Sequence, residues 1–316
     1  MKKLLLIDAN SLIHRSFHAL PPLTSLKGEP INAIYGLSSI LLKILRDHNP
    51  DYIVAAFDRP EPTFRDAIFT QYKAHRPPTD NLLVPQLHEA HNTFGKFGVK
   101  VVEQAGLEAD DIVGILAEKF KDKGTETLRQ DPSFAGLRAG KQGEIPRQTR
   151  DDNFGLKIVI FSGDKDNLQL VDGDKVVVEL LKTGVSKTVV YNESLFLQHY
   201  GFSPRQLVDY KALVGDTSDN IPGVRGIGPK GATDLIKEFG TIEKIYEDIE
   251  LVSKKVLKEK LVANKEMALM SRRLAEIKRD APLEISLEEI KFSGFNREIL
   301  KKYFEELGFK SLVERV

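Results

Sequence analysis

The sequence contains no cysteine among its 316 residues. This absence excludes disulfide bonds, thiolate metal sites and a cysteine nucleophile, and it is compatible with a reducing cytosol. Net charge is absent too, because 46 basic residues balance 46 acidic ones, so no basic field covers the whole molecule. The apolar run at the N-terminus ends at Asp8, which is too early for a signal-peptide core or a membrane-spanning helix. We therefore expect a soluble, cytoplasmic protein with no membrane partner.

Three continuous apolar stretches each lead into aspartate, namely residues 4–7 before Asp8, 52–57 before Asp58 and 157–161 before Asp164. Continuous rather than alternating apolar runs are typical of parallel strands that are covered on both faces. Helical spacing of apolar residues at 33–45 and 85–97 separates these strands. The alternation predicts an α/β fold with a mostly parallel sheet flanked by helices.

The second half of the chain changes character. Residues 176–181 and 188–191 predict a hairpin, and strand signals vanish from residue 193 onward. Helical patterns then follow at 194–200, 203–214, 232–239, 241–246 and most of 253–277. We therefore divide the chain into an α/β part, 1–191, and a helical part, 192–316. Residues 124–155 are rich in Gly, Gln, Arg and Asp and predict a mobile insertion.

Acidic residues are the principal candidates for chemistry. In open α/β sheets, ligands gather outside the carboxyl ends of the strands, so aspartates at three strand ends converge on one crevice. Glu108, Asp110 and Asp111 precede an amphipathic helix in greater number than helix capping needs. Each acid alone is more typical of capping, but together they predict a metal site of nine members: Asp8, Asp58, Glu108, Asp110, Asp111, Asp164, Asp166, Asp216 and Asp219.

Such a crevice needs counter-charge. Two like charges 4 Å apart repel by about 4 kcal/mol even at an effective dielectric constant of 20. Divalent cations supply the counter-charge, and oxygen ligands without cysteine, and with no histidine expected beside these acids, favour Mg²⁺ or Mn²⁺ over zinc. Two such ions about 3.5–4 Å apart form the arrangement used for displacement at phosphorus.

Two further segments are candidate binding elements. Around Tyr72, proline pairs bracket a stretch with aromatics and cations, in which Lys73 and Arg76 share a face if the stretch is helical and Tyr72 can stack on a base. Composition alone favours an ordinary solvated helix there. Beyond Asp219 the glycines 223, 226 and 228 precede Lys230 and a helix, which suits phosphate binding by backbone N–H groups. A tight turn between helices explains the glycines equally well.

Taken together, these motifs resemble a known family. LLIDAN, the Phe57-Asp58 pair, YKAHRPP, EADD, SGDKD and LVGDTSDNIPGVRGIGPKGA occur in the order of the motifs in the 5′ nuclease domain of bacterial DNA polymerase I. That domain belongs to the flap endonuclease and 5′-3′ exonuclease family. The resemblance covers nearly the whole chain except residues 124–155.

The resemblance implies a PIN-like core and a helical annex that contains a helix–three-turn–helix motif. Acids matching Asp8, Asp58, Glu108 and Asp110 hold one metal ion in the family, those matching Asp164, Asp166, Asp216 and Asp219 gather near a second, and Asp111 matches a further site acid. Lys73 and Arg76 match a helical arch, about residues 60–84, that admits a single-stranded 5′ end and stabilises charge at the scissile phosphate. The loop 223–230 matches the element that grips duplex DNA and also binds K⁺.

The activity implied is two-metal hydrolysis of DNA phosphodiesters that leaves a 5′-phosphate and a 3′-hydroxyl, in replication and repair. The implied partners are DNA with a single-stranded 5′ end or flap and a DNA polymerase, and we expect a monomer. Two alternatives stay open from the residues. A PIN-like ribonuclease explains the acids but not the glycine-rich loop, whereas a non-catalytic DNA-junction binding module explains the loop but not the acids.

Overall fold

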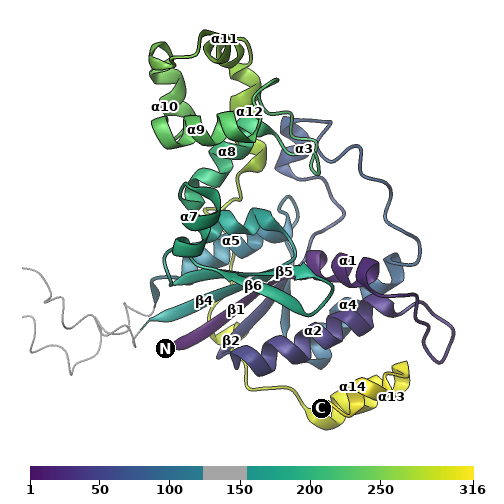
Figure 1. Ribbon diagram of the computed structural model, residues 1–316. Coiled ribbons are helices and arrows are strands. Elements are labelled where there is room, and N and C mark those ends of the chain that lie inside the picture. The colour runs from purple at the N-terminus through teal and green to yellow at the C-terminus, as the bar shows by residue number, and fades with distance from the viewer. Residues whose placement is uncertain (124–154) are drawn as a thin grey trace, which may run out of the picture.

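The computed structural model describes residues 1–123 and 155–316 (Figure 1). The predicted insertion, residues 124–155, lies outside the described residues except for Gly155. One six-stranded sheet occupies the middle of the molecule, with strand order β3-β2-β1-β4-β5-β6. All neighbouring strands are parallel except the hairpin of β5 and β6. The strands are β1 (Lys2–Asp8), β2 (Tyr52–Ala56), β3 (Lys100–Val102), β4 (Leu156–Ser162), β5 (Val176–Thr183) and β6 (Lys187–Tyr191).

The helices fall into two sets along the chain. Those of the α/β part are α1 (Ala9–Ala19), α2 (Asn32–His48), α3 (Phe64–Ile68), α4 (Val84–Lys96), α5 (Ala109–Phe120) and the 3-10 helix η3 (Lys165–Leu170). Those that follow the sheet are α7 (Glu193–Tyr200), η4 (Pro204–Gln206), α8 (Leu207–Val214), α9 (Pro229–Phe239), α10 (Ile242–Glu247), η5 (Ile249–Leu251), α11 (Lys255–Ala263), α12 (Lys265–Ala275), η6 (Glu288–Ile290), α13 (Arg297–Leu307) and α14 (Lys310–Val313).

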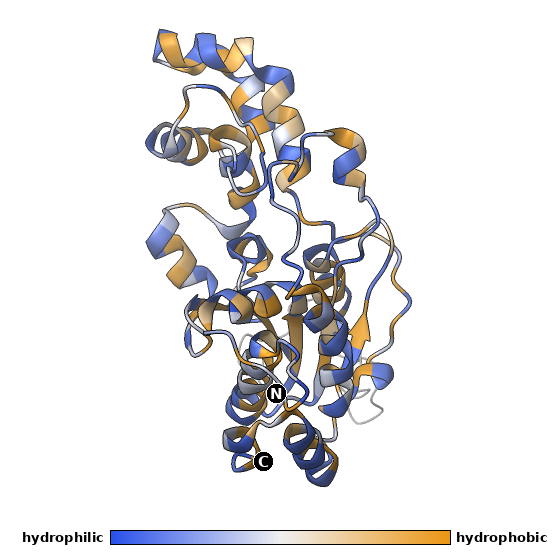
Figure 2. Ribbon diagram, turned by 90° about the vertical axis from the view of Figure 1, so that its right-hand side faces the viewer, coloured by the Kyte–Doolittle hydropathy of each residue, from blue (hydrophilic) through white to orange (hydrophobic). Residues whose placement is uncertain are grey.

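The central strands are apolar on both faces because both faces are covered. Leu4 and Leu6 of β1 lie in one hydrophobic cluster with α5, whereas Leu5 and Ile7 lie in a second cluster with α1, α2, α4, α13 and α14. Burying alternate residues on opposite faces explains why the apolar run of β1 is continuous. In Figure 2 the apolar colouring accordingly gathers along the strands and the helix faces turned to them.

The sheet and the helical part share packing. The cluster that contains Leu4 continues through Phe196 of α7 and Leu213 of α8 to Ile236 of α9. Figure 1 places α8 to α12 as a separate group of helices beyond the sheet, with α13 and α14 on the opposite side, beneath α2. The division of the chain into two domains at residue 191 stays a prediction.

The parallel sheet, the hairpin and the helices of both halves confirm the predicted fold class. The helical arch predicted for about residues 60–84 is mostly not helical. Between α3 and α4 the chain forms turns and extended segments, and Lys73 adopts a positive φ of 52°. Lys73 and Arg76 therefore do not share a helical face, because the helix ends at Ile68. Within the described ranges, no helix is long and apolar enough to cross a membrane.

Candidate active site

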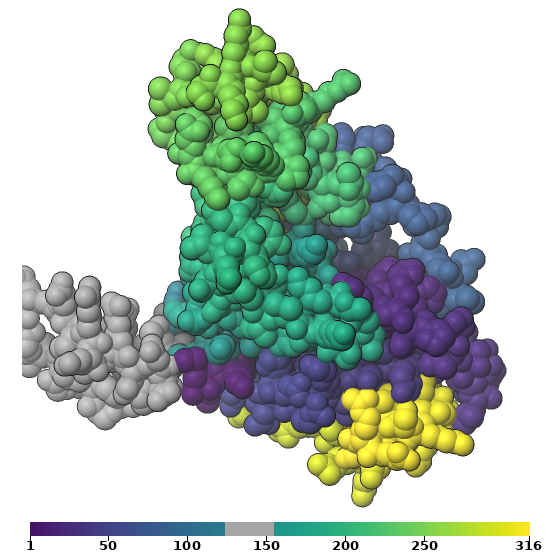
Figure 3. Space-filling view, in the orientation of Figure 1, coloured from purple at the N-terminus to yellow at the C-terminus, as the bar shows by residue number. Residues whose placement is uncertain are grey.

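A pocket of about 290 Å³ opens at the carboxyl ends of β1, β2 and β4. These are the strands around the point where the strand order reverses, which is where ligands bind in open α/β sheets. The pocket is lined by Asp8, Asn10, Ser11, His14, Asp58, Lys73, Arg76, Glu108, Ala109, Asp110 and Asp164. Five of the nine predicted acids and both predicted cations therefore line one pocket. In Figure 3 the blue residues between α3 and α4 pass along the side of this region, from the helical part to the body.

Asp8 is held rigidly at the base of the pocket. It ends β1 and is only 5% exposed. One carboxylate oxygen accepts a hydrogen bond of 2.6 Å from Ser162 Oγ, and the other accepts the N–H of Ser11 at 3.3 Å, which caps α1. Asn167, fully buried, donates its amide to the same two groups, Asp8 and Ser162. The carboxylate is thus oriented before any ligand arrives.

The first turn of α5 brings the second set of acids to the pocket. Asp58, just beyond β2, accepts the N–H of Ala109 at 2.6 Å, so the end of β2 is joined to the start of α5. Glu108 is the N-cap residue of that helix and Asp110 lies in its first turn. An N-terminal helix turn carries partial positive charge, which favours carboxylates there.

Four of the pocket acids lack a basic partner. In the described part of the chain Asp8, Asp58, Asp110 and Asp164 form no ion pair. Removal from water raises the pKa of each of these carboxyls, and neighbouring acids raise it further, as Asp58 does for Asp8 and Glu108 does for Asp58. Oδ1 of Asp110 is buried and has no hydrogen-bond partner within residues 1–123 and 155–316. We call these four residues the unpaired acids.

The other acids each have a cation beside them. Lys73 Nζ lies 2.7 Å from Glu108, and Arg76 donates to Asp219 at 2.5 Å. Lys211 of α8 binds both Asp166 and Asp216. We call Glu108, Asp111, Asp166, Asp216 and Asp219 the paired acids.

One lysine does not fully compensate two carboxylates. Burial raises the pKa of Asp166 to about 7 despite Lys211, with Asp164 adding to the effect. Asp216, less buried, has a lowered pKa because Lys211 and Ser218 outweigh the cost of burial. Burial opposes the charge of Lys211, but the two carboxylates raise its pKa nonetheless.

The unpaired acids fit divalent cations by their chemistry. A buried carboxylate oxygen without a partner, beside three further acids that lack basic partners, is costly unless a cation is bound. Among residues 1–123 and 155–316, however, no three side chains of the types that bind metals are grouped as ligands around one ion. Because Lys73 Nζ lies against Glu108, an ion that also used Glu108 as a ligand would require Lys73 to move away from it.

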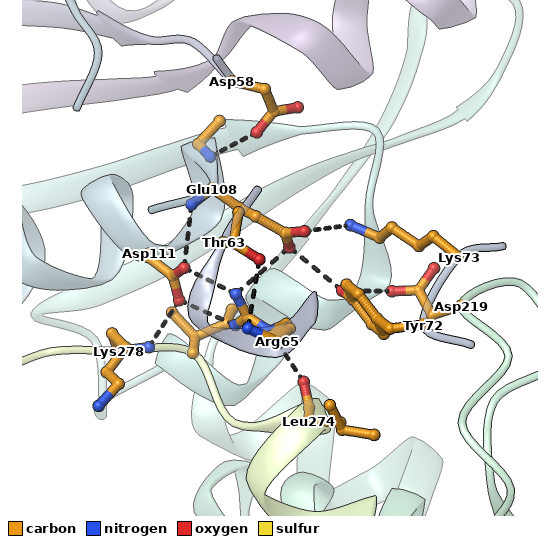
Figure 4. Close-up of polar contacts among 12 residues, drawn as sticks. Asp58, Thr63, Arg65, Tyr72, Lys73, Glu108, Asp111, Asp219, Leu274 and Lys278 are labelled. Atoms are coloured by element: carbon orange, nitrogen blue, oxygen red, sulfur yellow. Dashed lines mark hydrogen bonds and ion pairs between the residues drawn. The ribbon is translucent and has the colours of Figure 1, made fainter. Parts of the chain in front are cut away.

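The structure places Asp111 outside the pocket, contrary to its predicted role as a site acid. It is fully buried, and its two oxygens receive Arg65 in a bidentate pair at 2.7 and 2.8 Å (Figure 4). The same oxygens also accept the N–H groups of Glu108 and Lys278. No oxygen of Asp111 is left for a metal ion, because all its acceptor positions face protein donors.

Two other predictions about side chains need correction. Tyr72 is not available to stack on a base, since it is 5% exposed and packs with Val208, Ile221 and Leu274. Its hydroxyl contacts Glu108 and Asp219 instead. The prediction that no histidine lies beside the acids is also wrong, because His14 of α1 lines the pocket. Burial and the charges of His18 and Arg76 lower the pKa of His14.

The predicted glycine loop joins α8 to α9. Gly223 has a φ of 65°, and a Cβ there would lie 2.3 Å from the nitrogen of Gly215, so this glycine allows two backbones to touch. Its N–H donates to Ser271 and is not available to a phosphate. Gly228 is different: it caps α9 without a side-chain hydrogen bond, and the space around it is open. Lys230 beside it is exposed.

Sequence reasoning missed several residues of this region. Asn10, Ser11 and His14 follow Asp8 on the first turns of α1, and helical spacing from Asp8 was the available signal. Lys211 precedes Asp216 by little more than one helical turn, so the local charge pattern pointed to it. Arg65 gave no local signal, because its partner Asp111 is 46 residues away.

Comparison with known proteins gives matches over both halves of the chain. A family model described as the 5′-3′ exonuclease N-terminal resolvase-like domain matches residues 3–131, and one described as the 5′-3′ exonuclease C-terminal SAM fold matches residues 202–298. The 5′-3′ exonuclease of Aquifex aeolicus is 34% identical over 100% of this chain and 96% of its own length. DNA polymerase I of Bacillus subtilis is 39% identical over 100% of this chain, which spans 32% of that polymerase.

Solved structures share the fold. The zinc-bound 5′-exonuclease of T5 has a TM-score of 0.64 at 21% identity, covering 87% of this chain and 90% of its own. The catalytic core of Rad2 in complex with DNA substrate has a TM-score of 0.54 at 17% identity, covering 97% of this chain and 87% of its own.

Proposed function

The chain belongs to the 5′-3′ exonuclease family, and from that premise we propose that it is a structure-specific 5′ nuclease that hydrolyses DNA with the help of divalent metal ions. The observation that carries the proposal is the pocket in which acids from three strand ends and α5 meet Lys73 and Arg76. The chain spans only 32% of the length of its polymerase relative. That it acts alongside a DNA polymerase is therefore a part of the proposal.

The four unpaired acids, together with four of the paired acids, would hold the metal ions, which we propose are two Mg²⁺ with Mn²⁺ as a substitute. Asp8, Asp58 and Asp110, with Glu108, would serve one ion. Asp164, Asp166, Asp216 and Asp219 would serve the second. When bound, such ions stabilise the charge that develops on the attacking and leaving oxygens of the phosphodiester.

The cations of the segment between α3 and α4 would act on the substrate. The pKa of Lys73 is raised because nearby carboxylates, Glu108 foremost, outweigh the effect of burial, so Lys73 stays protonated at neutral pH. It cannot therefore serve as the general base. The ammonium of Lys73 and the guanidinium of Arg76, both of which line the pocket, would instead bind the scissile phosphate and stabilise its negative charge.

The helical part would hold the duplex. Gly226, Gly228 and Lys230 lie where α9 begins, and the N–H groups of a helix N-terminus attract phosphate. Gly223 supports the loop by packing against Gly215 rather than by contacting DNA. A K⁺ ion at this loop stays part of the proposal, as do the monomeric state and the cytoplasmic location.

The decisive test is cleavage of an end-labelled DNA flap with and without Mg²⁺. The proposal expects Mg²⁺-dependent release of the 5′ flap, which carries a new 3′-hydroxyl and leaves a 5′-phosphate on the shortened strand. Single-stranded RNA of the same length is the control for a PIN-like ribonuclease, and preferential cutting of the RNA would contradict the proposal. Flap binding without cutting at any metal concentration would identify a junction-binding module instead.

A further inference from the structure

Arg65 is an unusual residue for the start of an exposed segment. It lies in α3, directly before the turns that carry Lys73 and Arg76, yet only 2% of it is exposed. Its helix is fixed by a capping box, in which Thr63 and Asp66 exchange hydrogen bonds between side chain and backbone. Arginine is rarely buried unless every donor of the guanidinium has a partner.

The guanidinium joins three parts of the molecule (Figure 4). It pairs with both oxygens of Asp111 in α5, and one nitrogen also lies 3.3 Å from Glu108. Its remaining donors bind two carbonyl oxygens at the end of α12, those of Leu274 and Glu276, each at 2.9 Å. The first turn of α5 and the end of α12 thus meet at one side chain of α3, the helix that leads into the segment carrying Lys73.

Asp111 extends this junction in both directions. It accepts the N–H of Glu108 at 3.0 Å and therefore fixes the first turn of α5, where Glu108 and Asp110 present their carboxylates to the pocket. It also accepts the N–H of Lys278 at 2.8 Å, on the chain that leaves α12. Burial opposes the positive charge of Arg65, but the hydrogen bonds to Asp111 and the charges of Asp110, Asp111 and Glu108 raise its pKa.

On the basis of the proposed function, we infer that Arg65 is a positioning residue that sets the metal-binding carboxylates of α5 and the Lys73 segment in register with each other. Arg65 does not line the pocket itself, so it acts through Glu108 and Asp111. An ammonium group cannot replace it, because the fork of the guanidinium makes the bidentate pair and reaches two carbonyls at once.

The substitution Arg65→Lys tests this inference, since it keeps the charge and loses the fork. Outer residues that orient metal ligands typically contribute about 10- to 100-fold to metal affinity or activity. We expect the Mn²⁺ affinity of this variant, measured by electron paramagnetic resonance without DNA, to decrease by about 10- to 100-fold. We expect kcat on a flap to fall with it at saturating Mn²⁺, while KM stays within about threefold, since the duplex-binding loop is distant. Arg46→Lys, at an exposed arginine of α2, is the matched control and should change neither quantity.

A folded Arg65→Lys protein with unchanged Mn²⁺ affinity and unchanged kcat would overturn the inference. If that variant does not fold, hydrogen exchange of the unaltered protein decides. Mn²⁺ should then slow exchange at residues 64–68 and 274–278 as well as at 108–112, and protection confined to 108–112 would overturn the inference.

The two proposals fail in different ways. If the unaltered protein cuts flaps while Arg65→Lys keeps normal metal affinity and turnover, only the role of Arg65 is refuted. If the unaltered protein neither binds Mn²⁺ nor cuts, the proposed function and this inference are both refuted.

Discussion

The unpaired acids and the paired acids lie side by side, but they differ in what compensates the charge of their buried carboxylates. Asp166, Asp216 and Asp219 have Lys211 or Arg76 against them, whereas Asp8 and Asp110 form no ion pair with any residue that the structure describes. A cation beside a buried carboxylate offsets the cost of burying its charge, whereas a buried carboxylate without a cation destabilises the folded chain until a ligand binds. The difference separates the acids that are open to an ion as the structure stands from the acids whose lysine or arginine would first have to move away.

The largest expected effect comes from an unpaired acid. Asp110→Asn replaces a buried carboxyl group whose Oδ1 has no hydrogen-bond partner among the described residues. We expect flap cleavage to fall by about 10³-fold or more, as for other residues that act as one catalytic unit. Duplex binding and metal-free stability should not fall. Asp47→Asn, at an acid of α2 that is paired with Lys43, is the matched control and should cut normally. Cleavage by Asp110→Asn within tenfold of the unaltered protein would remove Asp110 from the site.

The next largest effect concerns Lys73, the cation that lines the pocket and pairs with Glu108. Lys73→Met should lower kcat by about 10²- to 10³-fold, because a charge that stabilises the phosphate is lost. Mn²⁺ affinity should not decrease, since the substitution removes a competitor from Glu108 rather than a ligand. Lys73→Arg should recover part of the rate. A drop in metal affinity with unchanged turnover would instead assign Lys73 to the metal site.

A third prediction converts paired acids into unpaired ones. Lys211→Met leaves Asp166 and Asp216 without their shared cation, and breaking such a buried pair costs about 3 kcal/mol of unfolding free energy. Denaturant unfolding at pH 8 should show that loss, and Mg²⁺ should restore more stability to this variant than to the unaltered protein. Lys43→Met, at a partly exposed pair, should cost less than about 1 kcal/mol. Equal losses of unfolding free energy in both variants would show that the ion pairs of Lys211 contribute no more to stability than a partly exposed pair does.

The last prediction is a dependence of metal-free stability on pH. An acid whose pKa is raised on folding binds its proton more tightly in the folded state, so its ionisation lowers stability as pH rises. The pKa of Asp166 is raised to about 7, so the loss develops between about pH 4 and pH 7. Asp166→Asn should therefore gain stability relative to the unaltered protein across that range in denaturant unfolding. A difference that is constant with pH would contradict the raised pKa.

The sequence predicted the parts of this molecule that depend on local pattern. Aspartates at the ends of β1, β2 and β4 could be placed because continuous apolar runs identify buried parallel strands, and parallel strands end at one edge. The turn-rich stretch between α3 and α4 was not predictable in this way. Its shape depends on contacts made far along the chain, as when Lys73 N–H donates to the carbonyl of Asp219.

The paired acids show the same limit. Nothing near Asp111 in the sequence distinguishes it from Asp110, yet one is bound by Arg65 and the other faces the pocket. Consecutive residues of a helix point about 100° apart, so neighbours can have opposite surroundings. Tyr72 was misassigned for a related reason, since its burial comes from Val208 and Leu274 in the helical part.

The most direct test is anomalous diffraction from crystals soaked in Mn²⁺. The account predicts a manganese peak in the pocket with oxygens of Asp8, Asp58 and Asp110 about 2 Å away. A second peak should lie towards Asp164, with Lys73 displaced from Glu108. Manganese bound only on the surface, with the pocket empty and the Lys73–Glu108 pair intact at saturating Mn²⁺, would contradict the account.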